Sequence, residues 1–395
     1  MRESVRTLID GRDERVKVSC LQENLQRALA QVSRAVATKT ALPVLSNVLL
    51  TTDDGRLKIA ATNLEIGITT WIGASIEDEG RITVDARLLS EFVNTLPADA
   101  VQLSSDPVRS SLLVQCGRDK AAINGIDADD FPVIPTVGGE AFSASVDPQV
   151  FREMIAQVEF AAASDDSRPV LAGVLCRFED QTLTLAAADG FRLAVREGAL
   201  TETVPSRLDV IVPARALREL ARIVGDSTEP VKLAITPNQS QLLARVGETE
   251  FLSRLIEGTF PDFRQIVPRE FSTRVELGRE AFMNAVRRAS YFARDNNDVI
   301  RLIVRPGDDD VMPGTIEITA TAAERGNSQS YVDSSVSGPE LQIAFNARYL
   351  TDVLGVVKQG QVVLGMNGAN QAGIVRPAGS EDYTHVIMPM VIGAH

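Results

Sequence analysis

The sequence is poor in the residues that most often carry catalysis and metal binding. It has two histidines, His385 and His395, so a Ser-His-Asp or Cys-His arrangement would depend on a residue near the C-terminus. A histidine-rich metal site is excluded for the same reason. Neither G-x-x-x-x-G-K-[ST] nor G-x-G-x-x-G occurs, so the two commonest nucleotide-binding loops are absent. These absences favour an interaction protein over an enzyme, with no cofactor and no metal.

Cysteines and long apolar runs are also scarce. Cys20, Cys116 and Cys176 are far apart and lie within or beside strand-like runs, which predicts reduced, partly buried thiols and not a disulfide or zinc framework. No apolar run approaches the roughly 18 residues that a membrane span requires. Residues 1–15 are too charged for a secretory signal. We therefore expect a cytoplasmic protein in which residues 1–15 form a short N-terminal extension.

Charge is unevenly distributed along the chain. The formal net charge is −13, which argues weakly against a general nucleic-acid binder. Arginines nevertheless gather on the faces of predicted helices, where they suit contact with phosphates. Exposed arginines paired with nearby acids are the alternative explanation. The basic clusters are Arg27, Arg34 and Lys39; Arg215, Arg218 and Arg222; and Arg287, Arg288 and Arg294. Acidic runs at 127–130 and 308–310 lack the spacing of an ion-binding loop and are expected to be solvated.

One stretch of sequence occurs three times at domain-sized intervals. It reads LKIAATNLEIGIT at residues 57–69, LTLAAADGFRLAV at 183–195 and IEITATAAERGNS at 316–328. Each copy begins as an alternating strand and runs through small residues into a charged turn. An interval of this length indicates repeated domains and not a solenoid. We predict an N-terminal extension at 1–15 and domains at 16–138, 139–269 and 270–395.

Each repeat also contains two predicted amphipathic helices. Their apolar stripes have helical spacing and begin at Leu25, Leu89, Phe151, Leu217, Phe282 and Leu350. An Ala-Arg pair introduces the second helix of every repeat, at 86–87, 214–215 and 347–348. Two helices cannot cover both faces of the many strands between them, so we expect an α+β fold with the helices on one side of antiparallel sheets.

The triple repeat, the motifs LAAADGFRLAV and GTFPDFRQIVP, and the terminal HVIMPM together resemble the bacterial DNA polymerase III β subunit family, the sliding clamps. The resemblance extends from about Val16 onward. It implies a non-enzymatic processivity factor for DNA replication, in which two three-domain protomers form a head-to-tail homodimer. The resulting closed ring encircles duplex DNA, with the helices lining the hole and the sheets outside. It would tether the replicative DNA polymerase, the clamp loader and repair proteins.

Specific residues follow from the resemblance. It implies that Lys39, Arg168 and Arg215 face DNA, and helix-face arguments add Arg27, Arg34 and Arg287. It also implies a dimer interface between Ala121 and Ile123 of the first domain and Tyr291 and Phe292 of the third. Between the second and third domains it implies a pocket for a short linear motif of partner proteins. That pocket would consist of Leu171, Ala188, Gly190, Phe191, Arg192, Leu193, Pro261, Ile266, Val386, Met388, Pro389 and Met390.

Two other interpretations remain open. A three-repeat scaffold that binds only protein would agree with the negative net charge. An enzyme that uses carboxylates would have Asp189, in the central motif, as its best candidate residue. In a sliding clamp Asp189 is instead expected to order the turn through hydrogen bonds from its side chain to the backbone. The sequence predicts a more apolar pocket than in many family members, which carry His in place of Phe191 and Thr in place of Ala188.

Overall fold

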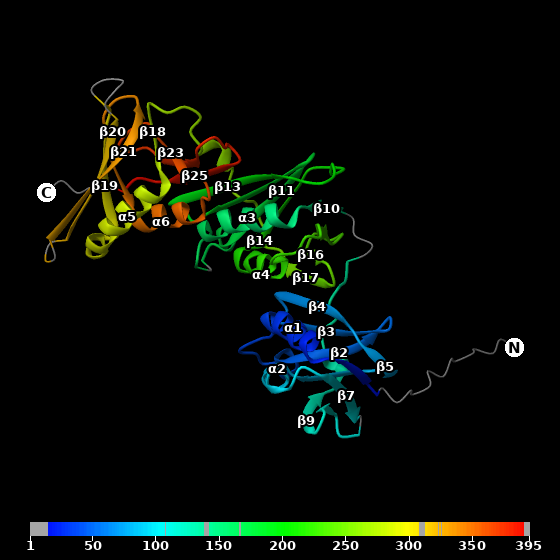
Figure 1. The fold of residues 1–395 in the computed structure, drawn as a ribbon. Helices are drawn as coiled ribbons and strands as arrows, with labels where there is room; N and C mark the ends of the chain where they lie inside the picture. The colour runs from blue at the N-terminus through cyan, green and yellow to red at the C-terminus, as the bar shows by residue number, and fades with distance from the viewer. Residues whose placement is uncertain are drawn as a thin grey trace. The chain divides into compact units, whose positions relative to one another are not determined.

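The computed structural model describes residues 15–106, 108–137, 142–165, 167–307, 313–322, 324 and 326–390 (Figure 1). Its contacts divide the chain into two compact units, Met1–Ser143 with Lys232–Arg254, and Ala144–Val231 with Leu255–His395. The predicted extension at 1–15, apart from Arg15, and the acidic run at 308–310 lie outside the described residues. In the described parts of the chain, no helix is both long and apolar enough to cross a membrane.

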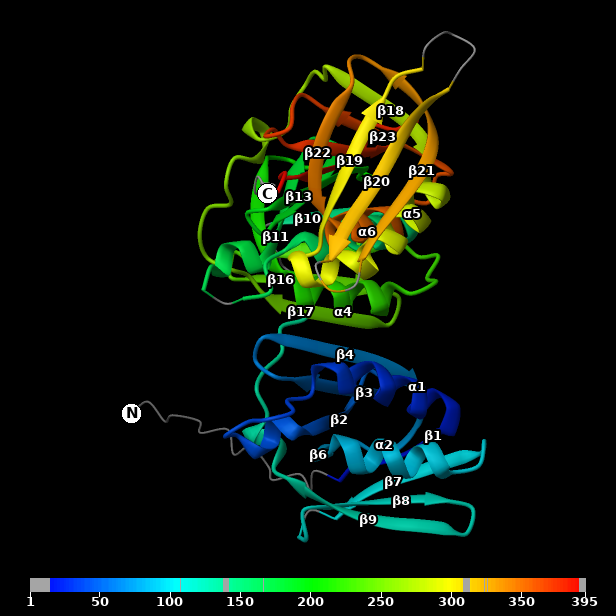
Figure 2. The same cartoon turned by 90° about the vertical axis from the view of Figure 1, so that its left-hand side faces the viewer.

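The described part of the first unit is built on an antiparallel sheet with two helices. Both helices, α1 (Gln22–Val32) and α2 (Ala86–Thr95), lie on one face of the sheet (Figure 2). The predicted stripe of Leu25, Ala28, Leu29 and Val32 is buried, which confirms the first helix. The strands follow one another as β15 (Val231–Ile235), β16 (Gln241–Val246), β17 (Thr249–Arg254), β4 (Ile66–Gly73), β3 (Arg56–Thr62), β2 (Asn47–Asp53), β6 (Arg81–Asp85), β9 (Asp119–Ile126), β8 (Ser111–Cys116), β7 (Ala100–Asp106), β1 (Lys17–Leu21) and β5 (Ser75–Asp78).

In its described residues, the second unit repeats this plan with four helices. They are α3 (Pro148–Val158), α4 (Ala214–Val224), α5 (Arg279–Ala293) and α6 (Ala347–Val356), and α3 follows the strand β10 (Phe142–Val146). The strands follow one another as β14 (Leu208–Pro213), β11 (Gly173–Glu179), β12 (Thr182–Ala188), β13 (Arg192–Ala199), β25 (Tyr383–Ile387), β24 (Gly373–Pro377), β23 (Gln361–Met366), β18 (Thr273–Gly278), β21 (Gly326–Ser337), β20 (Gly314–Ala322), β19 (Val299–Arg305) and β22 (Leu341–Asn346).

Helix starts follow the local sequence. The carboxylate of Asp147 accepts hydrogen bonds from the backbone N–H groups of Gln149 and Val150, both at 2.9 Å, and Pro148 occupies the first helical position of α3. The carboxylate of Asp85 caps α2 in the same way. The predicted Ala-Arg pairs mark the first residues of α2, α4 and α6. The six predicted helices are therefore confirmed.

The three copies of the repeated stretch form three hairpins, β3–β4, β12–β13 and β20–β21. The middle copy was predicted to be a strand that alternates between buried and exposed residues. This is wrong for β12, which has five consecutive buried residues. Helix α3 contacts this strand, and Ala186 belongs to a separate apolar cluster. A strand that is covered on both sides is apolar along its length.

Candidate functional site

Four of the predicted pocket residues lie in one apolar cluster of the second unit. Leu193 and Val386 are core members of this cluster, and Leu171 and Ala188 pack against it half-buried. Leu193 and Val386 stand directly opposite each other, because β13 pairs with β25. The cluster also contains Phe260, Phe263 and Ile374. Strand pairing thus brings together predicted pocket residues that are far apart in the sequence.

Large apolar side chains are exposed beside this cluster. Phe191 is 58% exposed, Ile266 45% and Met388 41%. The backbone N–H of Met388 donates to the carbonyl oxygen of Phe191 at 2.8 Å, so the terminal segment is attached to the turn that carries Phe191. Pro261 is exposed as well, while Pro389 and Met390 are half-buried. Exposed apolar groups next to a buried cluster are typical of a binding surface, and methionine adapts to varied ligands.

Asp189 organises the turn between β12 and β13. Its carboxylate accepts hydrogen bonds from the backbone N–H groups of Phe191 at 2.9 Å and Arg192 at 3.0 Å. The following residue, Gly190, has φ +96°, a conformation that side chains disfavour. These contacts agree with the interpretation of Asp189 as a turn residue, and they present Phe191 to solvent.

Arg192 is mostly buried and its guanidinium is fully engaged. It donates to the carboxylates of Asp189 at 3.0 Å and Asp352 at 2.6 Å and to the carbonyl oxygen of Phe160 at 2.7 Å. Its guanidinium carbon also lies 4.5 Å from the centre of the Tyr349 ring. Arg192 therefore ties the turn to α6, and it positions the pocket instead of offering a free cation to a ligand.

His385 lies behind this network and was not among the predicted site residues. The side chain is fully buried and stacks on Phe160 with ring centroids 5.5 Å apart. Neither ring nitrogen has a hydrogen-bond partner among the described residues. Burial, reinforced by the charge of Arg192, lowers the pKa of His385 to about 3, so the ring is neutral at ordinary pH. The only sequence signal for it was its place in the motif HVIMPM.

Arg168 also lies at the pocket turn. Its Nη2 donates to the carbonyl oxygen of Asp189 at 3.1 Å, and its guanidinium is 3.8 Å from the carboxylate of Asp165. Its contacts are therefore with the turn that presents Phe191. The role of Arg168 in facing DNA stays a prediction.

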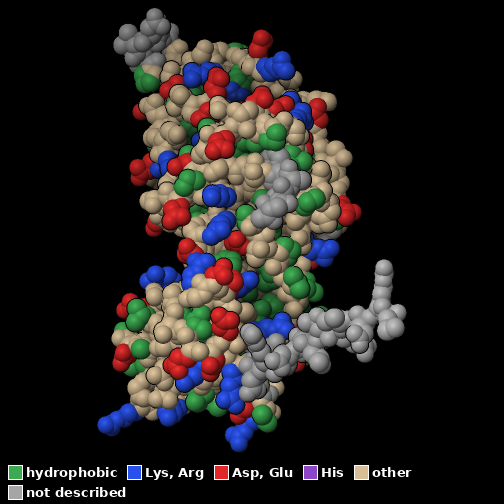
Figure 3. All heavy atoms as spheres, turned by 90° about the vertical axis from the view of Figure 1, so that its right-hand side faces the viewer, with side chains coloured by type: hydrophobic (Ala, Val, Ile, Leu, Met, Phe, Trp, Pro, Cys, Tyr) green, Lys and Arg blue, Asp and Glu red, His purple; other side chains and the backbone are tan. Residues whose placement is uncertain are grey.

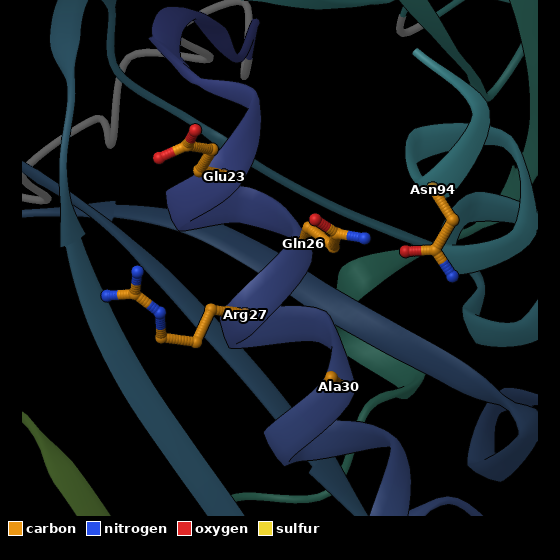
Figure 4. Close-up of a pocket in the computed structure, with 5 residues that line it drawn as sticks. All are labelled: Glu23, Gln26, Arg27, Ala30 and Asn94. Carbon is orange, nitrogen blue, oxygen red and sulfur yellow. The ribbon is translucent and has the colours of Figure 1, made fainter. Parts of the chain in front are cut away.

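The candidate DNA-facing residues of the first unit lie on or after α1. A groove between α1 and α2 is lined by Glu23, Gln26, Arg27, Ala30 and Asn94. In Figure 4, Gln26 and Asn94 point toward each other across this groove, while Arg27 extends on the other side of α1. Arg27 and Lys39 are exposed, and neither side chain has an ion pair within the described residues. Arg34 is exposed and has an interaction partner.

The arginines of the second unit differ in how far they are neutralised. On α4, Arg218 donates to Glu159 at 3.1 Å and Arg222 pairs with Glu219, so pairing with nearby acids is the correct explanation for these two. Arg215 is exposed and has a partner as well. Arg287 on α5 is exposed, and its guanidinium has no partner in the part of the chain that the structure describes.

The predicted interface residues lie near open strand edges. Residues 119–124 of β9 pair only with β8 among the described strands, and residues 326–333 of β21 pair only with β20. Ile123 is only 3% exposed, so β9 offers mainly its backbone edge, while Ala121 is half-buried. Tyr291 is 61% exposed on α5, the helix that packs against β21, and Phe292 is half-buried. The edge of β21 was missed by sequence reasoning, because its polar, serine-rich sequence has little apolar pattern.

Other surfaces carry less specific chemistry. On the face drawn in Figure 3, acidic and basic side chains are interspersed and form no extended patch of one sign. Within the described ranges, no group of three or more His, Cys, Asp or Glu residues is arranged to hold a metal ion. Cys20, Cys116 and Cys176 are all free and buried.

The chain is similar to known proteins along nearly its whole length. Three family models match it: the DNA polymerase III beta subunit N-terminal domain at residues 16–135, central domain at 145–262 and C-terminal domain at 264–391. It is 31% identical to the beta sliding clamp of Synechocystis sp. over 396 residues, which is 95% of this chain and 99% of the relative.

Solved structures of sliding clamps are similar to this chain in fold. The DNA polymerase sliding clamp of Bacillus subtilis superposes with a TM-score of 0.90 at 27% identity, covering 95% of this chain and 99% of that one. The DNA polymerase III subunit beta of Pseudomonas aeruginosa has a TM-score of 0.88 at 31% identity, covering 95% and 100%.

Proposed function

This chain belongs to the bacterial DNA polymerase III beta subunit family, the beta sliding clamps, and on that premise we propose that two copies close head to tail into a ring around duplex DNA. It has the three-domain clamp fold and functions as a DNA sliding clamp. The proposed domains are 16–138, 139–269 and 270–395, in a cytoplasmic protein whose buried cysteines stay reduced. Because escape from a closed ring requires opening it, the affinity for DNA itself can be weak.

The proposal of a ring rests on the open edges of β9 and β21. A strand edge with unpaired N–H and C=O groups readily accepts another strand. The two edges belong to different ends of the sequence, so pairing β9 of one copy with β21 of the other is heterologous. In the proposed ring of two copies each edge is used once per copy. Tyr291 and Phe292 on the helix beside β21, and Ala121 on β9, would add apolar contact at this joint.

DNA contacts are assigned to the exposed cations of the helices and the loop after α1. Arg27, Lys39 and Arg287 are the strongest candidates, because their charges are not neutralised by described carboxylates. Such contacts bind phosphates regardless of base sequence, which permits sliding. Arg34, Arg168 and Arg215 are retained as secondary candidates, since each already has an interaction within the protein.

The apolar cluster with exposed Phe191, Ile266 and Met388 is proposed as the docking site for the replicative polymerase, the clamp loader and repair proteins. A short linear motif would place apolar side chains against Leu171, Ala188, Leu193 and Val386. Asp189 and Arg192 serve this site by holding the turn, and no catalytic step is assigned to them. The surface favours apolar over polar motif residues, because Phe191 and Ala188 bring no hydrogen-bonding side chain.

A loading experiment tests the ring. The protein is loaded onto a nicked circular plasmid by the clamp loader, and the complex is washed in high salt before and after the plasmid is linearised. Retention on the circle and loss from the linear form would establish topological linkage. Loss from both forms in high salt would contradict the ring and favour a scaffold that binds only protein.

A further inference from the structure

A second groove is lined by residues on and beside the strands β18, β23 and β24 of the last repeat. Its volume is about 450 Å³. Its walls combine apolar and charged side chains, chiefly Phe271, Arg274, Val363, Ile374, Arg376 and Glu381. Ile374 and Phe271 also contact the apolar cluster of the partner pocket, whereas Arg274, Val363, Arg376 and Glu381 belong to none of the sites described above.

The groove and the proposed partner pocket lie on the same face of one sheet. Residues directly opposite each other on neighbouring antiparallel strands point to the same face of a sheet. One such row crosses six strands without a break, through Ala188, Leu193, Val386, Ile374, Gly365 and Arg274. The first three residues of this row are pocket residues and the last three line the groove. Leu193, Val386 and Ile374 are buried within the apolar cluster, so a peptide that reaches from the pocket to the groove would cross the outer side of this cluster.

Phe271 connects the two surfaces. A Cβ atom on Gly365 would lie 2.7 Å from the Phe271 ring, so the glycine allows this ring to lie directly on the sheet. The same ring packs against the apolar cluster of the pocket. Phe271 is thus a common wall of the pocket and the groove.

The far end of the groove carries a cation that is only partly engaged. Arg376 uses its Nε to donate to the hydroxyl of Thr384 at 3.0 Å, and no described carboxylate lies within ion-pair distance of its guanidinium. Arg274, by contrast, pairs with Glu276 at 3.2 Å. Planar guanidinium groups bind carboxylates through paired hydrogen bonds, so the free nitrogens of Arg376 are suited to a carboxylate ligand.

We propose that this groove extends the partner site and binds an acidic residue that flanks the apolar motif of the partner peptide. The proposal rests on the proposed function, because it requires the apolar motif to occupy the neighbouring pocket. Apolar residues next to the acid would lie on Phe271 and Val363, and the carboxylate would pair with Arg376. Arg274 would add a second, weaker attraction because Glu276 already neutralises part of its charge.

Selection from a random library of displayed 12-residue peptides tests the proposal. The full-length protein is compared with Arg376→Gln, with Arg376→Glu, and with Arg348→Gln, a matched control at an exposed arginine on α6. We expect wild type and Arg348→Gln to select an apolar motif with Asp or Glu at a constant distance from it. Arg376→Gln should lose the acidic preference, and Arg376→Glu should select Lys or Arg at that position.

The strength of the contact between Arg376 and the acidic residue is then measured with the selected peptide. Replacing its acid by Gln should weaken binding to wild type by about 3- to 10-fold in 50 mM salt, and by less in 500 mM salt, because screening weakens a partly exposed ion pair. The same replacement should have no effect on binding to Arg376→Gln. An apolar motif without an acidic preference would overturn this inference and leave the proposed pocket standing. A library that yields no apolar motif would overturn both.

Discussion

Because His385 stays neutral in the folded protein, the second unit should become measurably less stable at mildly acidic pH. The ring is fully buried, has no hydrogen-bond partner among the described residues and lies near the positive charge of Arg192. Its pKa is about 3 in the folded protein, compared with an ordinary value of about 6.5 in the unfolded chain. The unfolded chain therefore takes up a proton first as the pH falls below 6.5, and the free energy of unfolding decreases.

The magnitude follows from this difference. At pH 5 the unfolded chain is about 1.5 pH units below the pKa of its histidine, and each unit is worth about 1.4 kcal/mol. The folded ring is still neutral there, so the loss between pH 7 and pH 5 is about 2 kcal/mol. The stability contribution is complete above pH 6.5 and disappears progressively toward pH 3.

Comparing wild type with His385→Phe separates the contribution of His385 to the free energy of unfolding from that of the other titrating groups. Urea unfolding is followed at pH 7, 6 and 5 by circular dichroism. Amide hydrogen exchange of the paired strands β13 and β25 reports the second unit alone. Between pH 7 and pH 5 the free energy of unfolding of wild type should fall by about 2 kcal/mol more than that of the variant, whatever the difference between the two proteins at pH 7. A constant difference between the two proteins across this range would refute the argument.

Three further substitutions follow from the same structure. Arg192→Ala should cost about 3 kcal/mol or more in urea unfolding and abolish motif binding, since it leaves two carboxylates without their partner; an undisturbed protein would contradict the positioning role. Gly338→Ala should destabilise by at least about 2 kcal/mol, because its φ is +108° and a Cβ would lie 2.0 Å from the carbonyl oxygen of Ser272. Gly326→Ala, with positive φ but open space, is its control and should lose clearly less. Arg27→Gln should leave stability within about 0.5 kcal/mol and reduce the salt dependence of DNA association by about one counterion; an unchanged slope would remove Arg27 from the DNA-facing set.

The repeat architecture could be predicted because it depends on short-range patterns. The apolar stripes have the helical period, Asp147-Pro148 is a local start signal, and the copied hairpins share one sequence pattern. The buried face of α1 and the first residues of α2, α4 and α6 were therefore correct to the residue. Burial on the far side of β12 could not be predicted in this way, because it depends on which other elements cover the strand.

In the candidate site, too, some features depend on local sequence and others depend on which residues pack together. The residues of the partner pocket came from resemblance, and the sequence alone could not distinguish core from surface for Met388 or for the arginines of α4. The ion pairs of Arg218 and Arg222, and the engagement of Arg168 with the Asp189 turn, depend on where acids and carbonyls lie in space.

The sequence by itself determined the three-fold repeat, the six helices and the family, because periodicity and motifs are properties of neighbouring residues along the chain. Only the tertiary structure decided that β13 pairs with β25, which places Leu193 opposite Val386, buries His385 and continues one row of side chains from the pocket to Arg274. Pairing between strands some 190 residues apart is selected by the burial of a shared apolar face. That energy belongs to the assembled sheet, and no segment of the sequence carries it alone.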